Sequence, residues 1–339
     1  MSAAGPPQGA RPLGGAARSA VRGEHTSRLA VVALGGNALV RDAQHQSIAD
    51  QYVTVQSVAP YLVDMVDEGW NLVVTHGNGP QVGFILRRSE LAIAEVAPVP
   101  LDYVVGDTQG AIGYMFLKAL GNELRRRGRD RSVVAIVTQT VVAADDPAFA
   151  RPAKPVGAFM DVAVARRFEA QYGWTIAEDA GRGWRRTVAS PLPREIVELP
   201  TIAALCRQGV IVVAAGGGGV PVVRAADGSL VGIEAVVDKD LASALLAEQL
   251  AADLLVIPTG VEKVAMNFGQ PNERRLDSLT VAQVRAMAEA GEFGEGSMRP
   301  KVEAVAGFVA RRPGGAGVIT SPEKLRDALR RRTGTWIEG

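Results

Sequence analysis

The sequence predicts an α/β protein built around a mostly parallel β-sheet. Short buried apolar runs alternate along the chain with segments of helical periodicity, which is typical of such a sheet. Several of the apolar runs end directly in glycine and asparagine, so their loops should meet at the carboxyl edge of the sheet. The 339 residues, 47% of them hydrophobic, suffice for one large domain, with or without a subdomain.

The first predicted unit is a strand over residues 29–34 followed by Gly-Gly-Asn at residues 35–37. Backbone N–H groups in such a loop can bind an anion, although the same pattern also forms an ordinary tight turn. Helical spacing continues over residues 44–68, where Pro60 should kink or split the helix.

A second unit begins with a predicted strand over residues 71–75 and continues through the loop 76–81 into a helix over residues 82–94. His76 could act as a base in this loop, but no carboxylate lies near it in the sequence. We therefore favour a role for His76 as a hydrogen-bonding loop residue.

A long interruption follows the next helix, residues 105–127, and the next strand, residues 132–138. Residues 139–195 are rich in proline, tryptophan and charge, with one weak helix near residues 162–172. An interruption of this length in a compact domain is typical of a lid or a protruding subdomain. Lys154 lies within it and could close over a phosphate.

Another phosphate-binding pattern lies between residues 198 and 250. After a helix over 198–208, a strand over 211–215 runs into four consecutive glycines. A hairpin with arms 222–224 and 230–233 leads to Asp238-Lys239-Asp240, at the start of a helix that ends near Leu250. Bare backbone N–H groups and a lysine at a helix start together indicate phosphoryl chemistry.

The C-terminal third repeats the alternation of strand and helix. It is predicted to contain strands over 253–257, 316–320 and 335–337, helices over 280–290, 302–311 and 323–330, and a loop over 294–301 that ends at a lysine.

The charge balance and the cysteine content exclude several classes of protein. The net charge of +1 argues against a nucleic-acid binder, and no apolar run approaches the length of a membrane span. The single cysteine, Cys206, fits a reducing compartment, so we expect a cytoplasmic protein. We expect residues 1–28 to be a disordered extension; their arginine-rich, acid-poor start would also fit an organelle transit peptide.

Lysine is scarce in this chain. Only six of the 37 basic residues are lysine, so arginine supplies most of the positive charge. Lys154, Lys239 and Lys301 lie beside proline or aspartate in predicted loops or helix starts, where a flexible ammonium group can follow a migrating phosphoryl group. The chain contains no P-loop motif, no clean dinucleotide-binding motif and no nucleophile elbow. The function that these residues still favour is phosphoryl transfer, in which the protein positions the reactants and neutralises their charge.

These residues occur in motifs that closely resemble those of the carbamate kinases, which belong to the amino acid kinase superfamily. The resemblance runs in collinear order from about residue 29 to residue 337. The matching stretches include ALGGNAL (33–39), VVTHGNGPQVG (73–83), QGAIGYM (109–115), PAKPVG (152–157), AAGGGGVPV (214–222), GIEAVVDKDLASALLA (232–247) and GSMRPKVEA (296–304).

The resemblance implies a three-layer αβα sandwich, with the lid subdomain at about 139–195 inserted in a domain over 29–339, and a homodimer. It implies reversible transfer of a phosphoryl group between ATP and carbamate, which gives ADP and carbamoyl phosphate, with Mg²⁺ as cofactor. The useful direction would make ATP during breakdown of arginine or another ureido compound. We expect no dedicated metal site in the protein itself.

The resemblance also implies a role for each matching residue. Gly35, Gly36 and Asn37 would hold the transferred phosphoryl group and carbamate, and Asn78 with Gly79 would shape the carbamate end. Lys154 would close from the lid, Lys239 would neutralise the transition state, Asp240 would orient the lysines, and Lys301 would hold the ATP phosphates. The residues expected to approach the nucleotide are Gly216, Gly217, Gly218 and Gly219, together with Lys239 and Lys301.

Three departures from the family pattern stand close to these motifs. Ala265 replaces an aromatic residue expected near the adenine, and Arg299 replaces a glycine near the ATP phosphates. The segment before Gln109 reads Val-Gly-Asp-Thr where the family has Gly-Ala-Met-Ser. Two alternatives stay open: a related kinase of a small acid or an amino acid, and a regulatory homologue with little or no turnover.

Overall fold

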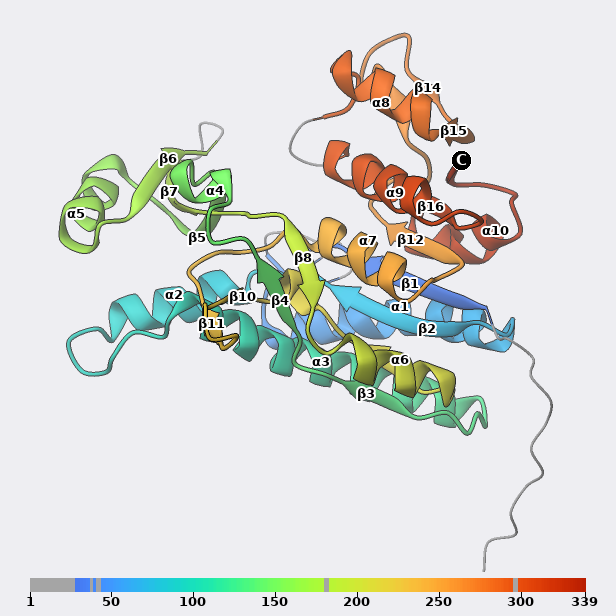
Figure 1. Cartoon of the computed structure of the whole chain (residues 1–339), viewed down its shortest axis with the longest axis horizontal. Coiled ribbons are helices and arrows are strands. Elements are labelled where there is room, and N and C mark those ends of the chain that lie inside the picture. The colour runs from blue at the N-terminus through green and yellow to red at the C-terminus, as the bar shows by residue number, and fades with distance from the viewer. Residues whose placement is uncertain (1–27, 37–38, 41–43, 180–182, 295–297) are drawn as a thin grey trace, which may run out of the picture.

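The computed structural model describes residues 28–36, 39–40, 44–179, 183–294 and 298–339. In this part of the chain the central sheet has the strand order β15-β17-β16-β12-β1-β2-β9-β3 (Figure 1), and its neighbouring strands are parallel except for β16 and β17. Its strands are β1 (Leu29–Leu34), β2 (Asn71–His76), β3 (Val133–Ala135), β9 (Ile211–Val213), β12 (Leu254–Pro258), β15 (Ser278–Thr280), β16 (Ala316–Thr320) and β17 (Thr335–Glu338).

Helices supply the crossovers that parallel strands require. They are α1 (Ile48–Asp67), α2 (Gln81–Leu91), α3 (Leu101–Arg126), α4 (Pro147–Ala150), α5 (Val162–Tyr172), α6 (Leu199–Arg207), α7 (Lys239–Gln249), α8 (Val281–Glu289), α9 (Arg299–Arg311) and α10 (Leu325–Leu329), with 3₁₀ turns η2 (Gly216–Gly218) and η3 (Pro322–Lys324). Within the described residues, no helix is both long enough and apolar enough to cross a membrane.

Strand β1 divides the hydrophobic core into two layers, because successive side chains of a strand point to opposite faces of the sheet. Ala30, Val32 and Leu34 pack among side chains of α1, α3 and α10. Val31 and Ala33 pack among side chains of α6, α7, α8 and α9. The helices thus cover both faces of the sheet (Figure 1), and the predicted three-layer αβα sandwich is confirmed.

The lid protrudes at one end of the molecule (Figure 1). Its described part is the sheet β5-β7-β6 with α5, formed by β5 (Lys154–Met160), β6 (Thr175–Glu178) and β7 (Trp184–Val188). The outer segments of the predicted insertion lie elsewhere. They form β4 (Gln139–Val142) and β8 (Pro193–Ile196), which join β10 (Val220–Arg224) and β11 (Leu230–Gly232) in another sheet. The remaining strands, β13 (Ala265–Met266) and β14 (Arg274–Arg275), pair with each other.

Several predicted boundaries differ from the observed ones by one to four residues, and local contacts explain two of these differences. Helix α1 begins after Ser47 rather than at Gln44, because the Ser47 side chain and Asp50 form a reciprocal capping box. Pro60 lies inside this one helix and does not split it. Strand β3 ends at Ala135 rather than Thr138, because the Thr138 N–H donates to the side chain of Gln109 instead of to a neighbouring strand.

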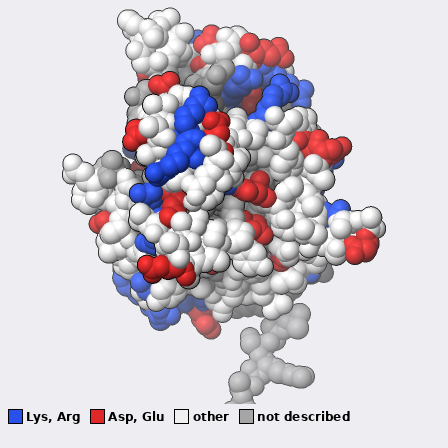
Figure 2. All heavy atoms as spheres, turned by 90° about the vertical axis from the view of Figure 1, so that its left-hand side faces the viewer, with Lys and Arg blue, Asp and Glu red and all other residues white. Residues whose placement is uncertain are grey.

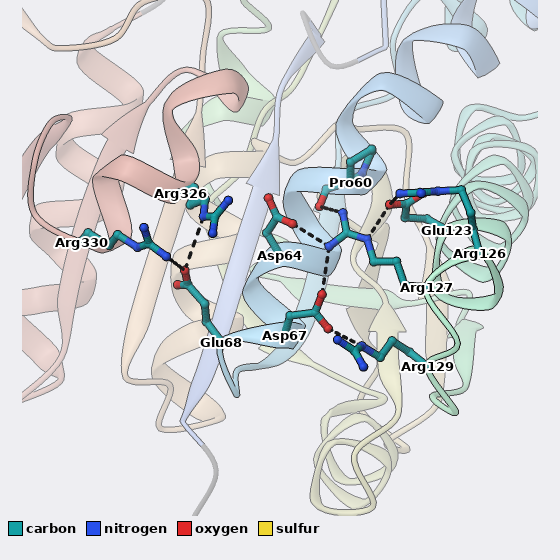
Figure 3. Close-up of polar contacts among 10 residues, drawn as sticks. All are labelled: Pro60, Asp64, Asp67, Glu68, Glu123, Arg126, Arg127, Arg129, Arg326 and Arg330. Atoms are coloured by element: carbon teal, nitrogen blue, oxygen red, sulfur yellow. Dashed lines mark hydrogen bonds and ion pairs between the residues drawn. The ribbon is translucent and has the colours of Figure 1, made fainter.

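A cluster of ion pairs joins the C-terminal ends of α1 and α3 (Figure 3). The guanidinium group of Arg127 lies 2.6 Å from Asp64, 3.0 Å from Asp67 and 2.6 Å from Glu123. It also donates to the carbonyl of Pro60 at 3.0 Å. Because the Arg127 side chain is only 18% exposed, these contacts stabilise the packing of the two helices more than a surface ion pair would.

Arginines around this cluster extend it on both sides (Figure 3). Hydrogen bonds from Arg126 and Arg127 lower the pKa of Glu123 to about 2, although partial burial opposes the shift. On the other side, Glu68 lies 3.1 Å from Arg330 and 4.0 Å from Arg326, which ties α1 to α10. The cluster lies away from the glycine-rich strand ends, so we assign it a structural role.

Candidate active site

A cavity of about 960 Å³ lies where the loops after β1 and β2 meet the start of the lid. Of the residues predicted from the sequence to form the site, those that line the cavity are Gly36, Asn78, Gly79, Lys154, Gly217, Lys239 and Asp240. These residues come from five separate stretches of the chain. The parallel topology brings them together, because the carboxyl ends of β1 and β2 and the N-terminus of α7 face the same space.

Asp240 connects two of the predicted lysines. Its Oδ1 atom accepts a hydrogen bond from the Nζ atom of Lys239, and its Oδ2 atom lies 3.2 Å from the Nζ atom of Lys301. Lys239 also donates to the carbonyl of Ala33 at 3.1 Å. Asp240 is only 4% exposed. Burial alone would raise the pKa of Asp240, but the two ammonium groups outweigh it and hold that pKa below its ordinary value.

The start of α7 fixes this arrangement. Asp238 is the N-cap, and its Oδ1 atom accepts hydrogen bonds from the N–H groups of Asp240 at 2.8 Å and Leu241 at 3.3 Å. One turn further on, the Ser243 hydroxyl lies 2.6 Å from the Thr75 hydroxyl at the end of β2. These contacts therefore fix Lys239 and Asp240 in position relative to the end of β2.

The lid contributes Lys154 to the same cavity. Its Nζ atom lies 3.5 Å from Oδ2 of Asp238 and 3.4 Å from the carbonyl of Val237. Arg87 and Arg185 also line the cavity. Figure 2, which faces the lid end of the molecule, shows Lys and Arg side chains gathered in a band, with acidic groups beside it. The positive charges of Lys154, Arg87 and Arg185 at the cavity favour an anionic ligand.

The loop after β2 is held by helix α3. Asn78 lies 2.8 Å from the hydroxyl of Thr108, which also lies 2.8 Å from the carbonyl of Val105. The Nδ1 atom of His76 lies 2.8 Å from the Gly77 carbonyl, and a carbonyl can only accept, so Nδ1 carries the proton. Burial, with a smaller contribution from Lys239, lowers the pKa of His76 to about 4. His76 is thus a neutral hydrogen-bonding residue, as the sequence favours.

Two of the four glycines, Gly216 and Gly217, lie against this same loop. A Cβ atom at Gly216 would stand 2.5 Å from the His76 ring, and one at Gly217 would stand 2.1 Å from the Asn78 amide. Gly217, Gly218 and Gly219 also have positive φ angles, which disfavour larger residues. Glycine is required here for close packing. The structure places Gly217 beside Asn78, and the expected contact of the glycines with a nucleotide stays a prediction.

The remaining predicted residues lie around these. Lys301, near the start of α9, reaches the site through Asp240. Gly35 follows β1 directly, and Asn37 lies outside the described residues. Ala265 is buried in β13, whereas the Arg299 guanidinium pairs with Glu303 at 2.8 Å along α9.

Sequence reasoning missed the side chains that hold the loops. Thr108 positions Asn78, and Gln109 bonds both the carbonyl and the N–H group of Thr138. Both residues lie in or beside the stretch that carries the family resemblance, but their partners are distant in sequence. The sequence places Asp238 at the start of a helix, but the contact of Asp238 with the lid lysine was not predicted.

The acidic side chains of the cavity are already engaged. Asp240 binds two lysines, and Asp238 caps α7 and faces Lys154. Among the described residues, no group of three or more His, Cys, Asp or Glu side chains is arranged to hold a metal ion. A divalent cation that arrives with a nucleotide takes most of its ligands from phosphate and water, and such a cation fits this site.

The fold and this lysine-rich site define a class of protein. The sequence profile of the amino acid kinase family matches residues 28–319, so the chain belongs to that family.

Its relatives narrow the class further. The chain is 47% identical to the carbamate kinase-like protein YahI of Escherichia coli and 45% identical to a carbamate kinase of Thermococcus kodakarensis, with 91% of this chain and 98% of each relative covered. Among solved structures, the carbamate kinase from Giardia lamblia bound to AMP-PNP superposes with a TM-score of 0.87 at 37% identity, and covers 92% of this chain and 98% of its own. The chain thus groups with the carbamate kinases.

Proposed function

We propose that this protein is a carbamate kinase, which transfers a phosphoryl group reversibly between ATP and carbamate to give ADP and carbamoyl phosphate. The observation that carries the proposal is the pair of lysines, Lys239 and Lys301, held by the single buried carboxylate of Asp240 beside the cavity. Lys154 faces the same cavity from the lid. Three ammonium groups around one space suit a reaction whose transition state carries negative charge on phosphoryl oxygens.

Each residue has a distinct part in this proposal. Lys239 lies between the loops that follow β1 and β2, and would neutralise the transferred phosphoryl group. Lys301 would bind the phosphates of the nucleotide, and Lys154 would approach from the lid. Asn78, with Gly79, would contact carbamate. No general base is needed, because carbamate is already an anion and the attacking oxygen carries the charge.

Magnesium would accompany the nucleotide. A Mg²⁺ ion bound to the phosphates supplies further neutralisation of their charge, as in other kinases. Asp240 binds two lysines and Oδ2 of Asp238 faces Lys154, so the phosphates and water would supply most of the ligands to the ion. The lysines would hold the phosphates.

One assay tests the function against its two alternatives. The purified protein is given ADP, Mg²⁺ and carbamoyl phosphate, and ATP formation is measured, with acetyl phosphate and aminoacyl phosphates as parallel donors. We expect ATP from carbamoyl phosphate at a rate far above the controls. Preference for another acyl phosphate would instead support a related acid kinase, and no turnover with any donor would support a regulatory homologue.

We further propose that the protein works in the cytoplasm as a homodimer, making ATP at the end of arginine or other ureido-compound breakdown. Support for a dimer comes from Tyr103 and Tyr114, large side chains of α3 that are 68% and 60% exposed. Light scattering would give a mass of twice 35.6 kDa if the dimer forms. The single cysteine is buried, as suits a reducing compartment.

A further inference from the structure

The two carboxylate oxygens of Asp238 face different parts of the molecule. Oδ1 points back into α7, where it accepts hydrogen bonds from the N–H groups of Asp240 and Leu241. Oδ2 points toward the lid and lies 3.5 Å from the Nζ atom of Lys154. The capping contact is local, whereas the other contact joins elements that lie far apart in the sequence.

The segment that leads to Asp238 lies against the base of the lid, where the chain enters the lid and where it leaves. Lys154 is the first residue of β5, where the chain enters the lid, and Val188 is the last residue of β7, where it leaves. Lys154 is paired with Val188 across these two strands. Directly after them, the carbonyl of Ala189 accepts a hydrogen bond from the N–H group of Val236 at 3.0 Å. Residues 235–238 therefore form the support on which the base of the lid rests.

The ammonium group of Lys154 is anchored at this support. Besides Asp238, it contacts the carbonyl of Val237 at 3.4 Å, and its side chain is 28% exposed. A lysine side chain has many rotamers, and holding it in one of them has an entropic cost. Lys239 lies in the same cavity and repels a second ammonium group. A negative charge beside Lys154 opposes both effects.

We propose that Asp238 is a positioning residue, which docks the lid lysine Lys154 beside the phosphoryl-transfer site through one oxygen while the other caps α7. The proposal rests on the proposed kinase function for its consequence in turnover. Asp238 acts on the reaction through Lys154 and not by contact with the transferred phosphoryl group. When the reacting anion binds, the ammonium group of Lys154 would move only a short way from Asp238 to the anion. The side chain is already ordered, so this step would cost little conformational entropy.

Substitutions at this position can separate the two roles. Asp238→Asn and Asp238→Ser both keep an oxygen that can cap α7, and both remove the negative charge that faces Lys154. Asp238→Ala removes the cap as well. We expect the first two variants to unfold at the wild-type temperature, and the alanine variant to unfold earlier. Loss of thermal stability in Asp238→Asn equal to that in Asp238→Ala would mean that the charge, rather than the cap, holds α7.

The kinetic test is a double-mutant cycle in the direction of ATP formation. Asp238→Asn should lower kcat about tenfold and leave the KM for ADP unchanged, since ordering one long side chain has an effect of this size. In a Lys154→Ala background the same substitution should have no further effect on kcat. Multiplicative effects of the two changes would show that Asp238 acts on its own, for example on Mg²⁺, and would overturn the proposal.

Hydrogen exchange gives a readout that needs no substrate. Amides of the lid over residues 154–160 and 184–188 should exchange faster in Asp238→Asn than in the wild type, while amides of α7 keep their protection. Unchanged exchange in the lid would contradict docking by Asp238 even if the enzyme proved active. An inactive wild type with faster lid exchange in the variant would instead contradict the proposed function and leave the docking in place.

Discussion

The Nζ atom of Lys301 lies 3.2 Å from Oδ2 of Asp240, although the two residues are 61 positions apart in the chain. The other oxygen of the same carboxylate accepts from Lys239, its neighbour in sequence. Asp240 is buried, so its charge is poorly screened by water and acts strongly on both ammonium groups. One carboxylate thereby sets the distance between the two lysines.

Asp240→Asn tests this bridge. An amide keeps the shape of the side chain but removes the charge that holds two ammonium groups together. We expect kcat for ATP formation from carbamoyl phosphate to fall by at least about 10²-fold and the thermal midpoint to fall as well, because two buried cations lose their partner. Steady-state kinetics and calorimetry would measure both. Wild-type kcat in a folded variant would contradict the bridging role.

Lys239→Ala tests the proposed charge neutralisation directly. The lysine lies in the cavity between the loops after β1 and β2, so its loss should lower kcat by at least about 10²-fold with little change in stability. Lys118→Ala is a matched control, since that lysine stacks on Tyr52 at 3.6 Å and lies outside the cavity residues. A near-normal kcat for Lys239→Ala would refute its role.

Lys154→Ala separates the lid from the nucleotide site. The residue faces the cavity from β5 and contacts the α7 cap, whereas Lys301 approaches through Asp240. Turnover should therefore fall while the affinity for ADP, measured by isothermal titration calorimetry, stays within about twofold of the wild-type value. Loss of ADP binding in this variant would show that Lys154 belongs to the nucleotide side.

The buried His76 predicts a dependence of stability on pH. The folded pKa of His76, about 4, lies below the ordinary value of 6.5. Between these two pH values His76 is therefore protonated in the unfolded chain and neutral in the folded protein. This contribution is fully present above pH 6.5 and is lost as the pH falls toward 4, by about 3 kcal/mol.

Chemical denaturation of the wild type and of His76→Asn at several pH values would isolate this term. Asparagine can place an N–H near the position of Nδ1 but does not titrate, and the carboxylates contribute equally to both proteins. The difference in unfolding free energy between them should therefore change between pH 7 and pH 4. A constant difference would mean that His76 has the same pKa in the folded and the unfolded protein.

Arg127→Ala tests the ion-pair cluster between α1 and α3. Removal of this mostly buried guanidinium leaves Asp64, Asp67 and Glu123 without a shared partner. We expect a loss of about 3 kcal/mol in unfolding free energy. Arg129→Ala is the matched control: among the described residues Arg129 forms an ion pair with Asp67, and it is 51% exposed, so its loss should cost about 0.5 kcal/mol. Similar losses in the two variants would contradict this account.

The local sequence predicted the elements well where strong periodicity or a breaker marked them. The strand of residues 29–34 and the helix start at residues 238–240 are observed as expected. The predicted boundary of an element was wrong where a side chain distant in sequence determines where that element ends. Strand β3 ends early because Gln109, on another element, takes up the N–H group of Thr138, and no local pattern reports such a partner.

The candidate site divides in the same way. The scarcity of lysine and the glycine-rich strand ends identified Lys154, Lys239, Lys301 and the loops, because residue type and turn chemistry are local properties. The sequence could not show that one carboxylate bridges two of these lysines. It also could not show that Gly216 packs on the His76 ring and Gly217 on the Asn78 amide.

The sequence by itself determined the class of fold, the family and the set of charged groups, since periodicity, glycine at strand ends and collinear motifs can be read from the chain. Only the tertiary structure decided which of these groups meet. Parallel strands bring their carboxyl ends to one edge, so residues from five stretches line a single cavity. The contacts that Asp240 and Asp238 make there decide where the three lysines lie.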